Sequence, residues 1–138
     1  MKKNKKYFKY SFSSKRNKLP KVEKITTSIA KKMNLSEEQK DNLSIAVTEA
    51  VGNAIVHGNK ENPRKKVFLE FTLKKNEINV SVKDQGEGFK PQKLTNPLKP
   101  ENIMKENGRG IFILKSLADQ VHFTEGGTKI SFTMKLSP

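Results

Sequence analysis

Glu49, Asn53 and His57 recur at intervals of four residues along one segment of the chain. In a helix, residues four apart lie side by side on one face. At 100° per residue, Glu49 and Asn53 fall between two apolar sectors, formed by Leu43, Val47, Ala50 and Ala54 on one side and by Ile45 and Val56 on the other. A carboxylate and an amide that point inward are costly unless they are bonded. The pair therefore predicts a polar site, whereas a lone Asn would more simply bond a neighbouring backbone.

A second group of residues is Asp84-Gln85-Gly86-Glu87-Gly88, which directly follows an apolar segment. Alternate glycines let a backbone turn sharply and approach a flat ligand, and an Asp at a strand end can accept a hydrogen bond from an amino group. The same pattern also describes an ordinary turn after a strand. This group therefore indicates a ligand only in combination with the others.

A third group, Gly108-Arg109-Gly110, precedes a segment with helical spacing at 111–118. Small residues at a helix N-terminus leave backbone N–H groups free to hold phosphate. An N-terminal turn without a ligand explains the pattern equally well. The segment is not a Walker loop, because no Gly-Lys-Ser/Thr follows.

Helices and strands to position these groups are readily predicted. Apolar spacing predicts a helix over 20–33, and Ser36 with Gln39 forms a capping box that starts a second helix. We expect that helix to run to about His57 and to end at Gly58 in a left-handed conformation. Period-two alternation predicts a strand pair at 67–73 and 78–82 and a second hairpin around Gly126-Gly127.

Residues 84–109 lack any period and contain three prolines, which predicts a functional lid over about 89–109. The fold class that follows is α/β (α+β), a two-layer sandwich whose largely antiparallel, mixed sheet carries helices on one face. A length of 138 residues predicts one domain over 1–138, with a basic N-terminal arm over about 1–18.

The charge is strongly positive and unevenly distributed. The chain has 28 Lys+Arg against 14 Asp+Glu, a net charge of +14, and ten of the basic residues lie in the first 24. Aromatic residues among them are suited to stacking on the bases of a nucleic acid. However, Phe8, Tyr10 and Phe12 also alternate as one face of an edge strand, and we favour that interpretation.

Several classes of protein are excluded by composition. The chain has no Cys, which excludes disulfides and thiolate chemistry. It has no apolar run of 18 residues and no hydrophobic segment of a signal peptide near its start, so we expect a cytoplasmic protein without a membrane partner.

Taken together and in order, the three groups resemble the ATP-binding boxes of the GHKL (Bergerat-fold) superfamily. The matching segments are 49–58, 84–89, 108–110 and Gly127-Thr128. The small anti-sigma factors and serine-protein kinases of that superfamily are the most similar members, and the resemblance runs from about residue 7 to the end.

The resemblance implies the phosphate-side roles. Asn53 would coordinate Mg²⁺, and Glu49 would act as the catalytic general base. Gly108 and Gly110 would cradle phosphate at the hinge of the lid. Some members carry a basic residue before the glycine pair, where this chain has Glu106 and Asn107, so Arg109 or Lys105 would reach the terminal phosphate instead.

The resemblance also implies the base-side roles. Asp84 would bond the adenine amino group, Gly86 and Gly88 would let the base pack, and Thr128 would support that contact. His57 is left out of the catalytic set.

The function implied is that of an ATP- and Mg²⁺-binding anti-sigma factor with serine/threonine-protein kinase activity. Its partners would be a sigma factor and an anti-sigma factor antagonist of the STAS type, and the chain would form a homodimer. A catalytically silent module that switches partners on nucleotide binding is the alternative. A nucleic-acid binder acting through the basic arm is a third interpretation, which would show salt-sensitive binding.

Overall fold

The computed structural model describes residues 5–87 and 106–136. Its elements follow one another as β1 (Lys6–Ser13), η1 (Arg16–Lys18), α1 (Leu19–Lys32), α2 (Glu37–Asn53), η2 (Ala54–Gly58), β2 (Lys66–Leu73), β3 (Glu77–Lys83), α4 (Glu106–Leu117), β4 (Gln120–Thr124), η4 (Glu125–Gly127) and β5 (Lys129–Lys135). The strands form one sheet in the order β1-β2-β3-β5-β4, and each of its four pairings is antiparallel. The predicted fold class is confirmed.

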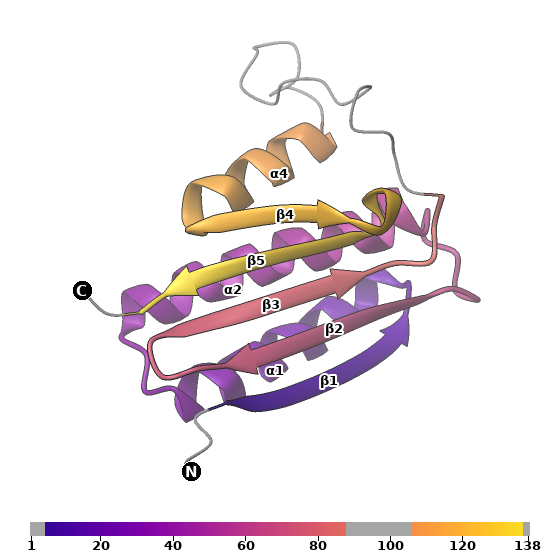
Figure 1. Ribbon diagram of the computed structural model, residues 1–138. Helices are drawn as coiled ribbons and strands as arrows, with labels where there is room; N and C mark the ends of the chain where they lie inside the picture. The colour runs from indigo at the N-terminus through magenta and orange to yellow at the C-terminus, as the bar shows by residue number, and fades with distance from the viewer. Residues whose placement is uncertain (1–4, 88–105, 137–138) are drawn as a thin grey trace.

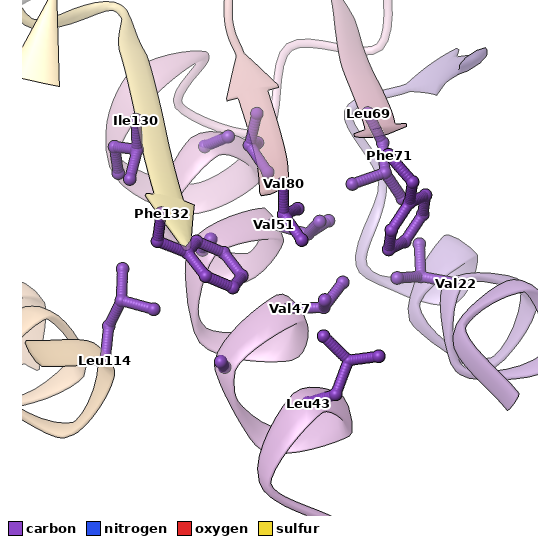
Figure 2. Close-up of a cluster of buried hydrophobic side chains, with 14 of the residues drawn as sticks. Val22, Leu43, Val47, Val51, Leu69, Phe71, Val80, Leu114, Ile130 and Phe132 are labelled. Carbon is purple, nitrogen blue, oxygen red and sulfur yellow. The ribbon is translucent and has the colours of Figure 1, made fainter. Parts of the chain in front are cut away.

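The helices α1, α2 and α4 cover one face of this sheet (Figure 1). The strands turn alternate residues toward them, and Leu69, Phe71, Val80 and Phe132 are each at most 1% exposed. Val47 and Val51 of α2 and Leu114 of α4 meet these side chains in one core (Figure 2). Burial of this apolar surface is the main force that fixes the helices to the sheet.

The basic N-terminal segment is largely regular structure in the part that the structure describes. β1 pairs with β2 from Lys6 to Ser13 and lies at the sheet edge. Phe8, Tyr10 and Phe12 share its inner face, and Phe12 is 6% exposed. The edge-strand interpretation of this segment is therefore confirmed.

The start of α2 agrees with the prediction in detail. The Ser36 hydroxyl accepts a hydrogen bond from the Gln39 backbone N–H at 3.1 Å, and the Gln39 side chain accepts one from the Ser36 backbone N–H at 3.0 Å. The Gln39 side chain also donates to the carbonyl of Leu136 at 2.8 Å. The capping box thus ties the first turn of α2 to the end of the sheet.

The end of α2 differs from the prediction. Asn53 is followed by a π-helical turn, η2, in which the Asn59 N–H donates to the Ala54 carbonyl five residues earlier at 2.8 Å. Gly58 does not have a positive φ, whereas Lys60 and Glu61 do, at 53° and 56°. The helical segment does end at Gly58, as predicted, but the left-handed glycine is wrong, because the positive φ angles come two residues later.

The start of α4 also differs. The helix already includes Glu106, so Gly108, Arg109 and Gly110 lie within it instead of preceding it. The predicted start at residue 111 is wrong because small residues do not prevent a helix when its other face is buried, as Leu114 is here. No helix in the described ranges is long and apolar enough to cross a membrane.

Candidate functional site

Three of the residues predicted to act on phosphate line one hollow. Glu49 and Asn53 of α2 and Gly110 of α4 line a space of about 210 Å³. The remaining lining residues are Leu19, Thr48, Gly52, Val56 and His57. One carboxylate, one amide oxygen and a glycine backbone thus converge on an open space between two helices.

The reason why Glu49 and Asn53 face this hollow differs from the one predicted. Ile45 is 45% exposed, so only Val56 of the second expected apolar sector packs against the core. The buried stripe of α2 consists of Leu43, Ala46, Val47, Ala50 and Val51. Glu49 and Asn53 are half-buried at the border of that stripe. The predicted second apolar sector included Ile45, but an exposed Ile does not mark a buried face of the helix.

Gly110 brings the backbone of α4 close to Glu49. A Cβ at position 110 would lie 2.9 Å from Glu49 Oε1, which is shorter than ordinary van der Waals contact. Any larger residue there would displace the Glu49 carboxylate. Gly110 therefore sets the distance between the acid and α4.

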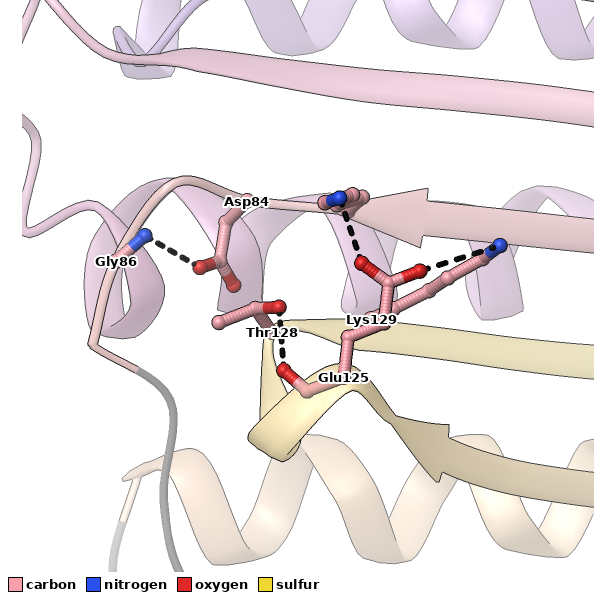
Figure 3. A network of polar contacts seen from close by, with 6 residues as sticks. Asp84, Gly86, Glu125, Thr128 and Lys129 are labelled. Atoms are coloured by element: carbon pink, nitrogen blue, oxygen red, sulfur yellow. Dashed lines mark hydrogen bonds and ion pairs between the residues drawn. The ribbon is translucent and has the colours of Figure 1, made fainter.

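Asp84 follows β3 at the other end of the candidate site and is 7% exposed. Its backbone N–H donates to the Thr128 carbonyl at 2.9 Å, and its Oδ1 accepts from the Gly86 N–H at 2.8 Å (Figure 3). Burial raises the pKa of this carboxyl, and the Gly86 hydrogen bond and the charge of Lys65 oppose that rise. Asp84 is thus a buried acid held by backbone contacts at the end of a strand.

Gly58 and Gly86 are required for close approach. A Cβ at position 58 would overlap the Asp84 carboxylate, and one at position 86 would overlap the Gly58 carbonyl. The end of η2 and the loop after β3 therefore pack with no room for side chains. This explains why position 58 is glycine although its φ is ordinary.

Thr128 lies beside Asp84 at the start of β5. Its hydroxyl donates to the Glu125 carbonyl at 2.8 Å, which closes the turn η4 (Figure 3). In this turn Glu125, Gly126 and Gly127 have positive φ values of 54°, 69° and 92°. Glu125 is held by the Lys83 ammonium at 2.6 Å, which lowers the pKa of its carboxyl.

Asp84 and the Glu49–Asn53 pair lie at different positions along α2 and the turn η2 that follows it. Asp84 lies against Gly58, which comes five residues after Asn53 and nine after Glu49 along α2 and η2. The site thus has an acid suited to an amino group at one end and an acid beside an amide at the other. Such an arrangement suits an extended ligand rather than a compact one.

The donors present are compatible with Mg²⁺ that is shared with a phosphate ligand. Among the described residues, no three His, Cys, Asp or Glu side chains cluster as a metal site. Mg²⁺ is commonly held by one or two protein oxygens and substrate phosphates, which is what the Asn53 amide oxygen can supply.

Some predicted contacts lie outside the described residues. These are the contacts of Gly88, those of the Arg109 side chain, and the lid except for its last four positions, which belong to α4.

One buried residue was missed by sequence reasoning. Asn59 is 1% exposed and bonds the loop after β3, yet an Asn behind a glycine signals only a turn.

The antiparallel sheet with helices on one face, and a site between α2, α4 and the loop after β3, define an ATPase-like domain. Residues 12–134 match the family model of the histidine kinase-like ATPase domain. The chain therefore belongs to the histidine kinase-like ATPase family.

The similar relatives include serine-protein kinases named RsbW and an anti-sigma F factor. The chain is 32% identical over 107 residues to the serine-protein kinase RsbW of Oceanobacillus iheyensis, with 72% of this chain and 68% of the relative covered. It is 33% identical over 117 residues to the RsbW of Bacillus licheniformis, with 79% and 73% covered. It is 34% identical over 102 residues to the anti-sigma F factor of Oceanobacillus iheyensis, with 69% and 68% covered.

A solved structure has the same fold. The RsbU and RsbW domains of a Mycobacterium tuberculosis protein superpose with a TM-score of 0.65 over 95% of this chain, at 13% sequence identity. This chain spans about a third of that one, since 31% of it is covered. The similarity confirms the fold.

Proposed function

We propose that this chain is an ATP-binding anti-sigma factor with serine-protein kinase activity toward an anti-sigma factor antagonist. Two lines of reasoning support the proposal. The relatives are named serine-protein kinase RsbW and anti-sigma F factor. The observation that carries it is the shared hollow of Glu49, Asn53 and Gly110, which lies along α2 from Asp84.

In this proposal Asp84 accepts a hydrogen bond from the adenine amino group. Its Oδ1 already accepts from Gly86, so the carboxylate is oriented before the base arrives. Thr128 braces the Asp84 backbone from β5, and Gly86 lets the loop pack against Gly58. That Gly86 and Gly88 let the base pack stays a prediction.

The phosphates occupy the hollow at the other end. Asn53 supplies an oxygen ligand to Mg²⁺, whose chemistry when bound is to neutralise charge on the phosphates. On the α4 side, the residues proposed to bind phosphate are Gly108, Arg109 and Gly110. Catalysis of phosphoryl transfer depends mainly on such positioning and charge compensation.

Glu49 acts as the general base. The serine hydroxyl oxygen of the antagonist forms a bond to the γ-phosphorus, the bond from that phosphorus to the bridging oxygen breaks, and ADP leaves. The hydroxyl proton passes to the Glu49 carboxylate, which lies close to the backbone of Gly110.

The first prediction concerns this base. Glu49→Gln preserves shape and removes proton acceptance, so we expect a loss of phosphate transfer of at least about 100-fold. The measurement is transfer of radiolabel from γ-labelled ATP to the antagonist that copurifies from the host. Glu38→Gln makes the same change on an exposed turn of α2 and serves as the control.

Retention of transfer in Glu49→Gln would refute the assigned base. Nucleotide binding without transfer to any copurifying antagonist would instead favour the silent partner-switching module. Binding of DNA that is lost at higher salt would favour the nucleic-acid interpretation.

The remaining assignments follow from this function. A regulator of sigma factors acts where RNA polymerase acts, so the proposed location is the cytoplasm. The homodimer stays a prediction, and sedimentation equilibrium of the purified chain tests it.

A further inference from the structure

Asn59 is a buried amide whose nitrogen and oxygen contact different parts of the fold. Its Nδ2 donates to Ser14 Oγ at 2.7 Å and to the Lys66 carbonyl at 2.9 Å. Its Oδ1 accepts from the Gln85 N–H at 2.7 Å. The nitrogen thus joins the end of β1 to the start of β2, and the oxygen reaches the loop after β3.

The Gln85 N–H is one of three consecutive amides that define this loop. The Asp84 N–H is bonded to β5 through Thr128, and the Gly86 N–H is bonded to the Asp84 side chain. Asn59 binds the amide between them. Asn59 thus holds the backbone N–H of Gln85, which lies between Asp84 and Gly86. It does so from a segment that belongs neither to this loop nor to β5.

The two glycine contacts leave little tolerance in this region. Gly58 lies against the Asp84 carboxylate, and Gly86 lies against the Gly58 carbonyl. Asn59 follows Gly58 directly, so the residue that packs on the carboxylate and the residue that bonds its loop are neighbours in sequence. The π-helical turn before them directs both toward the loop, because it adds one residue to the last turn.

We propose that Asn59 is a positioning residue for nucleotide binding, whose side-chain oxygen holds the Gln85 peptide so that the Asp84 carboxylate is oriented for the base. The inference rests on the proposed function. It assigns to Asn59 no contact with the nucleotide. Without the amide oxygen, the Gln85 N–H loses its bond to Asn59 and the Asp84 carboxylate samples other orientations.

A purely structural role would make Asn59 equivalent to its partner Ser14. Ser14 is fully buried, accepts from Asn59 and donates to the Lys65 carbonyl at 2.7 Å. Ser14→Ala breaks these bonds and leaves the Asn59–Gln85 bond in place. Ser14→Ala and Asn59→Leu are therefore a matched pair, since both remove buried hydrogen bonds and only the second removes the bond to the Gln85 N–H.

The experiment measures binding of fluorescently labelled ATP and the steady-state kinetics of phosphate transfer. For Asn59→Leu we expect the Kd and the KM for ATP to rise about tenfold or more with kcat nearly unchanged, which corresponds to loss of one bond to a buried partner. Ser14→Ala should retain the wild-type Kd within about twofold although it is less stable. Equal Kd values for folded Asn59→Leu and wild type would overturn the inference. A wild-type chain that binds no labelled ATP would instead overturn the proposed function.

A second measurement does not depend on nucleotide or on Asn59→Leu folding. Amide hydrogen exchange of the nucleotide-free wild type should show protection of the Gln85 N–H, although Gln85 itself is exposed and lies outside the strand. Asn59→Asp keeps an acceptor oxygen and should retain that protection, with an ATP affinity closer to wild type than that of Asn59→Leu. Exchange of the wild-type Gln85 amide at the rate of an unstructured peptide would overturn the inference.

Discussion

At the scale of single residues, Asp84 combines a functional geometry with an energetic cost. Its carboxyl is buried by the same packing of Gly58 and Gly86 that aims it. Burial raises its pKa, so the folded chain binds a proton more readily than the unfolded chain. The charged form therefore lowers the free energy of unfolding, and this cost sets in as pH rises from the usual value of 3.8 through the raised pKa.

The second prediction follows from that sign. Asp84→Asn keeps an acceptor for the Gly86 N–H and removes the buried charge, so the nucleotide-free variant should be more stable than wild type at pH 7. The advantage should shrink as pH falls through the raised pKa of Asp84. Urea unfolding of both proteins over that range measures it, and a variant less stable than wild type at pH 7 would contradict the argument.

The third prediction concerns ligand binding by the same residue. Binding to the folded state alone raises the melting temperature by mass action. Mg·ATP at millimolar concentration should therefore stabilise wild type and leave Asp84→Asn unshifted, as followed by differential scanning fluorimetry. An unshifted wild type would count against nucleotide binding altogether.

At the scale of elements, two glycines, one in α2 and one in α4, have different structural roles. A Cβ at Gly52 of α2 meets nothing within 4 Å, whereas one at Gly110 of α4 meets Glu49. The first glycine costs helix stability without relieving a contact, and the second maintains the spacing of the site. The same substitution should therefore separate stability from activity.

The fourth prediction uses this pair. Gly52→Ala should raise the free energy of unfolding by about 0.5–1 kcal/mol, because alanine favours the helix. Gly110→Ala should also gain helix stability but should reduce phosphate transfer, because the methyl group displaces the end of the Glu49 side chain. Urea unfolding and radiolabel transfer give both numbers. Full activity of Gly110→Ala would show that the position of Glu49 is not set by α4.

Elements defined by local patterns were predictable from the sequence. The alternation of Phe8, Tyr10 and Phe12 predicts β1, and the capping box of Ser36 and Gln39 predicts the start of α2, since each signal lies within a few residues. Gly58 shows the limit of such reasoning. Position 58 requires glycine because of its contact with Asp84, 26 residues away. The sequence therefore suggested a left-handed helix end where the structure has close packing.

The same limit explains the other errors. Ile45 is apolar in sequence but is 45% exposed in the structure. Gly108 and Gly110 read as a loop, but burial of Leu114 against the core favours a helix that already includes them. In each case tertiary contacts decided what local composition left open.

At the scale of the whole molecule, the charge of +14 has a general effect on stability. Excess like charge disfavours the compact state, and salt screens exposed charges over about 8 Å at physiological ionic strength. The ion pairs of the described surface are partly exposed, such as Arg16 with Glu61 at 3.0 Å, and pairs of this kind contribute little. Repulsion should therefore be the larger of the two effects.

The fifth prediction is that NaCl stabilises the nucleotide-free chain. The melting temperature should rise between about 0.02 and 0.3 M NaCl and then level off as screening saturates. KCl at matched ionic strength is the control, because screening depends on ionic strength and not on the cation. A melting temperature that falls over this range would mean that the ion pairs outweigh the repulsion.

The edge strand β1 gives part of this charge another meaning. An edge strand presents unpaired backbone groups to which a strand of another molecule can add. On β1, Lys6 and Lys9 are exposed along that edge, and at the opposite edge β4 is only five residues long. A second copy that paired in register would bring like ammonium groups together. The lysines that first suggested a nucleic-acid partner therefore also disfavour edge-to-edge pairing of two sheets.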